Sequence, residues 1–312
     1  MGATGELALP LPGGGSTRAR WATFTRWAQR DLSLARLGEG HADAVAILAE
    51  LGASADPAGD DALWGVWAAE PPGYTLEARR AGAGWLLSGV KPFCSGARVC
   101  TRALVTAREG DRRRLFAVDA GHPGVVPRPE SWPAAGMAGS DTLDVDFDAV
   151  AAVNVGEPGA YVERPGFHHG GIGVAACWYG GARAVANTLL TASRSWDLDS
   201  HALAHLGAVD SRLATVGALL EEAARQVDAD PSDRAGTARL RTMRVRAAVE
   251  DAVGDVLRRV GRALGAAPLG HDAAHARAVA DLTVYVRQHH AERDLAALGK
   301  AASATRLSWE VA

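Results

Sequence analysis

The stretch from Trp64 to Asp148 constrains the fold most strongly, because it has the pattern of several short β-strands. In residues 143–148, Leu, Val and Phe alternate with Asp, as in a strand with one buried and one solvated face. Gly and Pro divide the stretch, and further strands are expected at 102–108 and 114–119. Short strands at this spacing predict a small antiparallel barrel or sandwich.

Apolar residues recur at helical spacing on both sides of this stretch. Residues 19–51 form a shorter helical pattern, and four long amphipathic segments after Gly159 predict a four-helix bundle. The expected fold is α+β and mostly α, with N-terminal helices, a central antiparallel β-barrel or sandwich, and a C-terminal four-helix bundle. The expected parts are a flexible tail (1–16), a reduced N-terminal helical domain (17–62), a β domain (63–158) and a helical bundle (159–312).

Composition excludes several classes of partner. The 312 residues include 33 basic and 36 acidic side chains, so no basic surplus indicates nucleic-acid binding. No apolar run approaches the ~20 residues of a membrane span, and the N-terminus lacks the pattern of a secretory signal. Three cysteines without metal-ligand spacing favour a reducing cytoplasm and predict no metal site.

Three segments of the β stretch carry a family resemblance. They are Trp67-Ala-Ala-Glu-Pro71, Lys91-Pro-Phe-Cys-Ser-Gly-Ala97 and Gly136-Met-Ala-Gly-Ser-Asp-Thr142. With a β module between two helical modules, the chain resembles the acyl-CoA dehydrogenase superfamily over about 31–299. It is similar to a divergent member, because it has room for only two or three N-terminal helices. The resemblance implies FAD, with FMN as the alternative, and a homodimer or homotetramer.

The resemblance implies that segment 91–97 lies against the flavin ring. Phe93 would stack beside the flavin, with Cys94 next to it, and the Ser95 hydroxyl would point toward the reactive nitrogen. A hydroxyl and backbone N–H groups there would stabilise negative charge on reduction. Ala69 replaces the family's flavin-contacting Thr, so contacts from Ala68 and Ala69 would be through the backbone. The alternative is an ordinary strand that ends in a Ser-Gly turn.

Two other sequence motifs of the family are only partly present in this chain. By resemblance, Arg194, Arg262 and Gly265 stand where the FAD diphosphate and adenine are held across a subunit boundary, and arginine binds phosphate well. His41 and His168 would lie near the substrate. The alternative for His41 is an ordinary surface or core histidine. The alternative for His168 is a residue in the ordinary first turn of a helix.

The segment Tyr285-Val-Arg-Gln-His-His-Ala-Glu-Arg-Asp294 holds the candidate catalytic base. The family's Tyr-Glu-Gly-Thr motif is absent, and the candidates are Glu292, His289 and His290. A base over the substrate's α carbon supplies roughly 10²–10⁴-fold. Arg287-Gln-His289 also resembles the Arg-Thr-His of flavin monooxygenases with this fold. The alternative is a solvated, salt-bridged helix end.

Three functions follow from these patterns. The first is α,β-dehydrogenation of an acyl-CoA or acyl-carrier thioester, with a flavoprotein as electron acceptor. The second is a flavin monooxygenase or oxidase that uses oxygen. The third is a non-catalytic family member, which the replacements at Ala69 and Ala138 favour.

Overall fold

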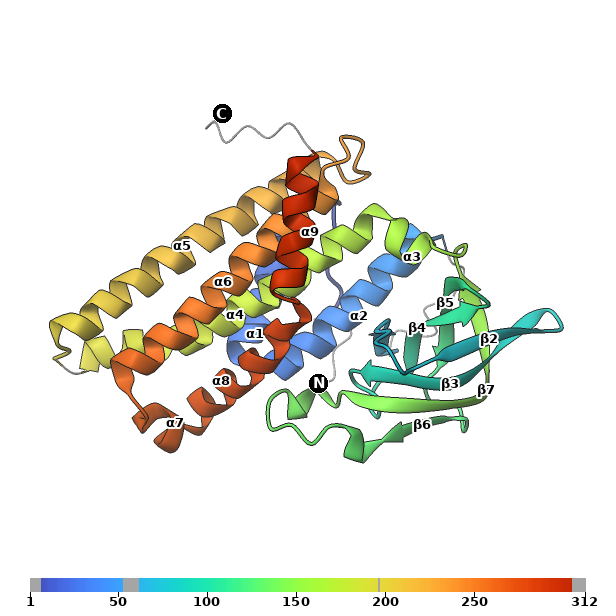
Figure 1. The fold of residues 1–312 in the computed structure, drawn as a ribbon, viewed down its shortest axis with the longest axis horizontal. Helices are drawn as coiled ribbons and strands as arrows, with labels where there is room; N and C mark the ends of the chain where they lie inside the picture. The colour runs from blue at the N-terminus through green and yellow to red at the C-terminus, as the bar shows by residue number, and fades with distance from the viewer. Residues whose placement is uncertain (1–6, 53–61, 196, 305–312) are drawn as a thin grey trace. The chain divides into compact units, whose positions relative to one another are not determined.

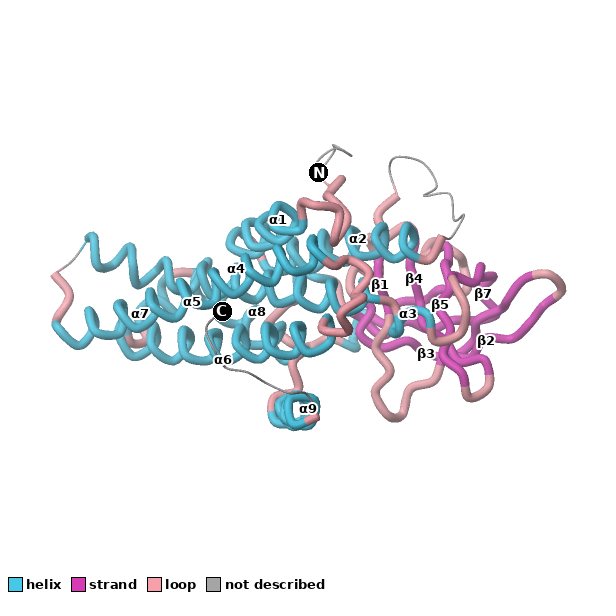
Figure 2. Tube along the Cα trace, turned by 90° about the horizontal axis from the view of Figure 1, so that it is seen from above, coloured by secondary structure: helices cyan, strands magenta, loops and turns pink. Residues whose placement is uncertain are grey.

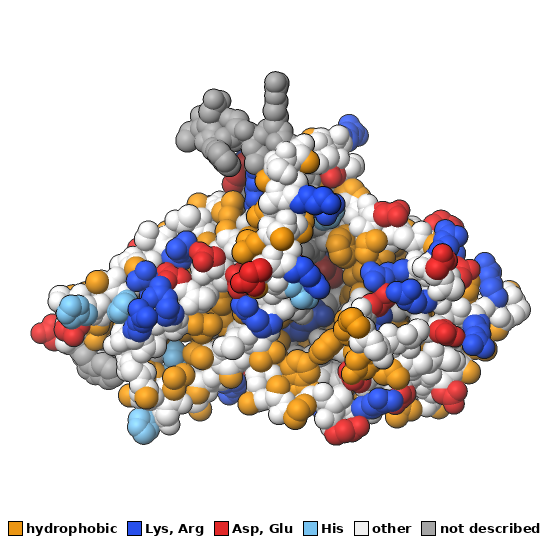
Figure 3. All heavy atoms as spheres, viewed as in Figure 1, with side chains coloured by type: hydrophobic (Ala, Val, Ile, Leu, Met, Phe, Trp, Pro, Cys, Tyr) orange, Lys and Arg blue, Asp and Glu red, His pale blue; other side chains and the backbone are white. Residues whose placement is uncertain are grey.

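The computed structural model describes residues 7–52, 62–195 and 197–304. The Gly, Pro, Ser and Asp residues at 53–61 predict a loop, and these residues lie outside the described ranges. The chain divides into two compact units, of which the first comprises residues 1–11 and 33–167 and the second residues 12–32 and 168–312. Within the described ranges, no helix has the length and apolar character that a membrane span requires. Basic and acidic side chains are intermixed on the face in Figure 3.

The first unit is built on a β-barrel (Figure 1). Strand pairing runs from β4 through β2, β3, β7 and β5 back to β4, which closes the sheet, while β1 adds to β4 and β6 to β7. The expected barrel is confirmed, but β4 pairs in parallel with β1 and β2. The strands are β1 Trp64–Trp67, β2 Leu76–Ala81, β3 Gly84–Cys94, β4 Arg102–Glu109, β5 Arg112–Asp119, β6 Val125–Arg128 and β7 Leu143–Val155.

Alternating burial along β3 and β7 fills the barrel with side chains. Leu87 lies opposite Val150 in the antiparallel register, and both are fully buried. The register shifts at Gly89, whose φ is 129°; a Cβ there would lie 2.2 Å from the carbonyl oxygen of Thr75. Only glycine fits at this bulge. Beyond it, β3 continues to Phe93 and Cys94 at its end, and Ser95 follows directly.

Helix α2 (Leu32–Glu50) covers one face of the barrel. Its Ala44, Ile47 and Leu48 pack against buried side chains of β1, β4, β5 and β7. This apolar contact fixes the helix on the sheet and so positions the polar residues of its N-terminal half. The short elements of this unit are η1 Pro129–Ser131, η2 Ala138–Ser140 and α3 Ala160–Glu163.

The second unit is helical (Figure 2). The four predicted amphipathic segments correspond to α4, α5, α6 and α8, whereas α9 was not expected from the sequence. Its helices are α1 Thr17–Arg30, α4 Pro165–Ser195, which begins in the first unit, α5 Ser200–Ala229, α6 Ala238–Leu264, α7 Ala267–His271, α8 Ala273–Tyr285 and α9 Glu292–Ser303, with η3 Val286–Gln288.

The first helix, α1, is anchored within the second unit. The carboxylate of Asp228 accepts hydrogen bonds from Gly15 N, Thr17 N and Thr17 Oγ1, so the start of α1 is held by the end of α5. A Cβ on Gly180 would lie 2.4 Å from the carbonyl oxygen of Thr25, which shows how closely α1 approaches α4. Helix α1 therefore belongs to the helical unit, whereas α2 from Ser33 onward belongs to the barrel unit.

Candidate functional site

Phe93, the predicted flavin-stacking residue, ends β3 in a strained conformation. Its φ is 58°, in a region that bulky residues rarely adopt, and its side chain is 50% exposed. The ring meets Trp132 edge-on, with centroids 6.3 Å apart and planes at 86°. The backbone is thus held in a costly conformation that leaves an aromatic face in solvent, as a stacking site for a planar ring requires.

Ser95 is fixed through both of its oxygen atoms. Its carbonyl accepts a hydrogen bond of 2.9 Å from Trp67 Nε1. Its Oγ accepts one of 3.2 Å from Arg36 Nε and shares one of 2.9 Å with Thr142 Oγ1. The residue is 8% exposed. Two elements besides its own strand end therefore position the Ser95 side chain.

Cys94 lies between these residues but faces the other way. Its thiol is buried in the barrel core and donates to the Lys91 carbonyl at 3.2 Å. Burial raises its pKa well above the ordinary 9.0. The Cys94 side chain is therefore part of the barrel core, and the predicted cofactor contact of this residue, which could be made through its backbone, stays a hypothesis.

A buried contact between two α2 residues, Arg36 and Glu39, supports Ser95, and sequence reasoning missed it. Arg36 Nη1 lies 2.5 Å from Glu39 Oε2, and Glu39 is 2% exposed. Burial raises the pKa of Glu39 to about 8; Arg36 lowers it and the charge of Asp43 raises it. The available signal was the spacing of Arg36, Glu39 and Asp43, which places the three residues on one helix face.

Lys91, in the same motif as Ser95, has a structural role inside the barrel. Its ammonium group is buried and donates to the carbonyl and hydroxyl oxygens of Thr106, both at 2.7 Å. Burial lowers its pKa to about 8, against the attraction of Glu70, whose carboxylate is 3.7 Å away. Glu70 also accepts from Arg113 at 2.6 Å. The half-buried Ala68 and Ala69 precede this structural carboxylate.

His41 joins α2 to the sheet. Its Nδ1 accepts a hydrogen bond of 3.2 Å from the backbone N–H of Trp64, at the start of β1. This bond gives His41 a structural role that requires no ligand. Its predicted substrate contact stays a hypothesis.

His289 is the buried member of the three predicted bases. It is 2% exposed, and its Nδ1 has no hydrogen-bond partner among the described residues. Burial lowers its pKa, while Asp294, 4.0 Å from Nε2, raises it. Ala291, two residues later, has φ 46° and ψ −119°, a strained conformation for a non-glycine residue. At neutral pH this imidazole is therefore uncharged and can accept a proton.

The other two predicted bases lie on the surface. The His290 side chain is 54% exposed, with its Nδ1 3.6 Å from Asp294. Glu292 is the first residue of α9 and is exposed. An exposed carboxylate lacks the apolar surroundings that would make it a stronger base. Within this segment, only His289 has the environment of a proton-transfer group.

Arg246 on α6 supports the turn before His289, and sequence reasoning missed this residue too. Its guanidinium donates to the carbonyls of Gly171 and Gln288, each at 3.0 Å. It also lies 4.5 Å from the ring centre of Trp178, a cation–π contact. One side chain thus connects α4, α6 and the residue that precedes His289.

The histidines at the start of α4 are held by backbone groups. The His168 carbonyl accepts from Thr242 Oγ1 at 2.8 Å, and Nε2 of the buried His169 lies 3.0 Å from the Pro231 carbonyl. His168 is half-buried, and its predicted substrate contact remains a hypothesis.

Arg194 and Arg262 are exposed side chains in the last turns of α4 and α6. These two helices end at the same end of the second unit (Figure 1). Gly265 caps α6 with φ 64°, and its N–H donates to Gly261 O at 2.9 Å. Cations are favourable at helix C-termini, and these two are also accessible to an anionic ligand.

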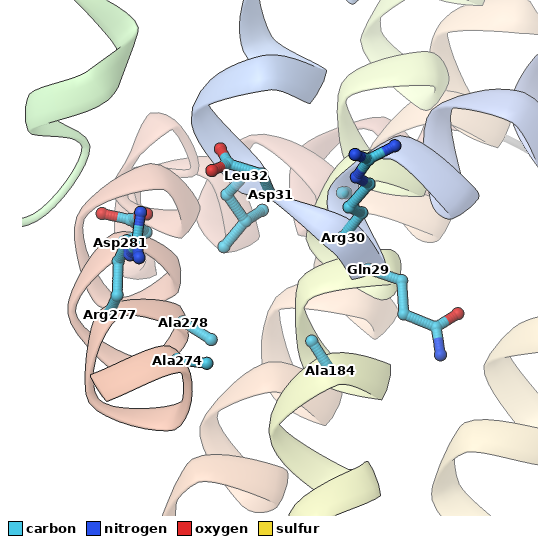
Figure 4. A pocket seen from close by; sticks show the side chains of 10 residues that line it. Gln29, Arg30, Asp31, Leu32, Ala184, Ala274, Arg277, Ala278 and Asp281 are labelled. Carbon is cyan, nitrogen blue, oxygen red and sulfur yellow. The ribbon is translucent and has the colours of Figure 1, made fainter. Parts of the chain in front are cut away.

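A cavity of about 110 Å³ lies in the second unit, where α1 meets α2 (Figure 4). Arg277 and the buried Asp281 lie together on α8, and Ala184 forms part of the wall. Ligand pockets usually have about 300–1,000 Å³, so this cavity is too small for a flavin. No group of His, Cys, Asp and Glu side chains in the described part of the chain could hold a metal ion.

Comparisons with known proteins agree with this architecture. The family model of the acyl-CoA dehydrogenase middle domain matches residues 69–150. A search of curated protein sequences gave no match. TdsC from Paenibacillus sp. A11-2, solved with FMN and indole, has a TM-score of 0.81 at 19% identity over 92% of this chain and 83% of that chain.

Two further structures share the fold. A nitrososynthase from Micromonospora carbonacea var. africana has a TM-score of 0.77 at 21% identity, over 93% of this chain and 82% of that chain. A glutaryl-CoA dehydrogenase from Mycobacterium smegmatis, solved with FADH2, has a TM-score of 0.81 at 17% identity, over 95% and 82%. The chain therefore has the acyl-CoA dehydrogenase-like fold, and its residues 69–150 match the family model of that fold's middle domain.

Proposed function

We propose that this protein is a flavin-dependent oxidoreductase that uses a reduced flavin and oxygen to oxygenate a small substrate. Phe93 and Ser95 support flavin binding, because a strained backbone presents an aromatic face beside a fixed hydroxyl. A bound flavin supplies two-electron redox chemistry and reactivity with oxygen. In the overall reaction, substrate, O2 and reduced flavin give oxygenated substrate, water and oxidised flavin.

The observation that carries this choice is the contrast between His289 and Glu292. His289 is buried and its Nδ1 meets no hydrogen-bond partner in the described part of the chain, whereas Glu292 lies in solvent. The uncharged imidazole of His289 would hold or return the proton that oxygen reduction and water release require. Two of the structural relatives, a dibenzothiophene monooxygenase and a nitrososynthase, are named for reactions other than acyl dehydrogenation.

The second candidate is α,β-dehydrogenation of an acyl thioester carried by CoA or a carrier protein. The middle-domain match and the glutaryl-CoA dehydrogenase relative favour it. In that reaction His289 would be the base, since Glu292 is exposed. The electron acceptor would be a flavoprotein instead of oxygen. For either reaction we propose a cytoplasmic homodimer or homotetramer.

An oxygen electrode and a spectrophotometer separate the two reactions. We expect the purified protein with reduced FMN to consume oxygen faster when indole or dibenzothiophene is present, and to form an oxygenated product. Anaerobic bleaching of the bound flavin by any member of an acyl-CoA panel would support dehydrogenation instead. Failure to bind either FMN or FAD would contradict both candidates.

Replacement of His289 tests its role. We expect His289→Asn to lower kcat by roughly 10²–10⁴-fold, because the proton-transfer group is lost. Since burial lowers the pKa of His289, the acid limb of the wild-type pH–rate profile should fall below pH 6.5. His290→Asn is the matched control and should keep kcat within about twofold. Equal losses in the two variants would contradict the assignment.

A further inference from the structure

A chain of hydroxyl groups runs from Ser95 into the loop before β7. Ser95 Oγ lies 2.9 Å from Thr142 Oγ1, and Thr142 Oγ1 lies 2.8 Å from Ser140 Oγ. Ser140 Oγ in turn donates to the carbonyl of Met137 at 2.7 Å. All of these residues are buried, so bulk water does not compete for these bonds.

The carbonyl at the end fixes the direction of every bond in the chain. A carbonyl oxygen only accepts, and a hydroxyl has one hydrogen to donate. Ser140 gives its hydrogen to Met137, so Thr142 must donate to Ser140. The hydrogen of Thr142 is then used, and Ser95 must donate to Thr142.

Arg36 fixes the other side of Ser95. A guanidinium has no acceptor, so its Nε–H donates to Ser95 Oγ at 3.2 Å. The contact with the buried Glu39 carboxyl, 2.5 Å from Arg36 Nη1, holds Arg36 in this position. Of the two lone pairs on Ser95 Oγ, one accepts from Arg36 and one remains. The hydroxyl therefore meets a ligand as a hydrogen-bond acceptor and has no hydrogen left to donate.

We propose that Thr142 and Arg36 are positioning residues that hold the Ser95 hydroxyl as an acceptor, so that this site prefers the N–H-bearing reduced flavin over the oxidised flavin. The inference rests on the proposed flavin function. It differs from the expectation that the Ser95 hydroxyl stabilises negative charge on the reduced flavin.

The chemical basis is the change in the ring nitrogens on reduction. Two electrons and two protons convert the oxidised ring, which has bare acceptor nitrogens, into a dihydro ring that carries N–H donors. The lone pair of Ser95 Oγ can accept a hydrogen bond from an N–H of the reduced ring. Against a bare nitrogen of the oxidised ring, the two lone pairs repel each other. The acceptor thus binds the reduced form more tightly and makes the bound flavin easier to reduce.

The test is the midpoint potential of bound FMN, with the dissociation constants of oxidised and reduced FMN measured anaerobically. We expect Ser95→Ala to weaken binding of reduced relative to oxidised FMN by about tenfold, which is a shift of about 30 mV to more negative potential. Thr142→Val frees the Ser95 hydrogen for donation and should shift the potential the same way. Thr142→Ser keeps the chain and should restore the wild-type value.

A double-mutant cycle separates positioning from a general structural effect. In the Ser95→Ala background, Thr142→Val should cause no further shift, because the group that it positions is already absent. An unchanged or more positive potential in Ser95→Ala would overturn the inference while leaving flavin binding intact. If the wild-type protein bound no flavin, the proposed function would fail together with this inference. Thr142→Val keeps the shape of the side chain. If Thr142→Val nevertheless folds poorly, the direction of the potential shift in Ser95→Ala decides the question alone.

Discussion

At the scale of single residues, the fold changes the charge state of buried groups. The pKa of Glu39 rises from its ordinary 4.5 to about 8 because burial removes the carboxyl from water. The folded protein therefore binds more protons than the unfolded chain between these pH values. The stabilisation linked to this group is fully present below about pH 4.5 and is lost as the pH rises through about 8.

Glu39→Gln tests this linkage. The variant cannot ionise at this position, so its free energy of unfolding should lose the part of the pH dependence that Glu39 causes between pH 5 and 8, on the order of 4 kcal/mol. Urea unfolding at a series of pH values measures the difference from wild type. Glu77→Gln, at an exposed position on β2, is the control and should keep the wild-type slope. Parallel curves for Glu39→Gln and wild type would show that Glu39 does not take up the proton.

At the scale of elements, Arg246 links α6 to α4 and to the turn that precedes His289. We expect Arg246→Lys to lower the free energy of unfolding by about 2 kcal/mol, because an ammonium cannot reproduce the fork of two carbonyl contacts and the stacking on Trp178. It should also reduce kcat, since the turn is held less firmly. Arg244→Lys, at an exposed position on the same helix, should change neither quantity. A stable Arg246→Lys protein with wild-type kcat would rule out this support role.

The ends of α4 and α6 offer a test of the cofactor's identity. If the protein uses FAD in the way that its family resemblance implies, Arg194→Ala and Arg262→Ala should each weaken FAD binding by roughly tenfold, because each removes a charge-assisted contact. FMN binding should be unchanged. Fluorescence titration measures both affinities. Arg239→Ala, at the opposite end of α6, is the matched control. Equal affinity of all three variants for FAD would favour FMN as the natural cofactor.

At the scale of the whole molecule, ligand binding and folding are linked. A flavin that binds only the folded chain, present at a concentration 100 times its Kd, should stabilise the protein by about 2.7 kcal/mol. That corresponds to a rise of several degrees in Tm for a protein of this size. Differential scanning fluorimetry with FMN, FAD and riboflavin measures the shift. Equal Tm values with and without each ligand would argue for the non-catalytic family member instead.

The architecture could be predicted from local sequence patterns. Alternation in 143–148 and the turn residues of the β stretch specified strands, and stripes of period 3.6 specified α4, α5, α6 and α8. These signals are local, because burial of one face imposes the same period on any strand or helix. The motif around Phe93 and Ser95 was also visible, since it occupies consecutive residues of one strand end.

Which polar groups act together could not be predicted from the sequence, because it depends on how the elements pack. Arg36, Ser95 and Thr142 are far apart in the chain, and no periodicity indicates that their side chains form one hydrogen-bonded chain. The same holds for Arg246, which meets the segment before His289 from another helix. His289 and Glu292 are three positions apart in the same polar segment. His289 is nevertheless buried, whereas Glu292 is exposed. Hydrogen bonds and desolvation depend on distances in space, whereas the pattern of a sequence records only which face of each element is buried.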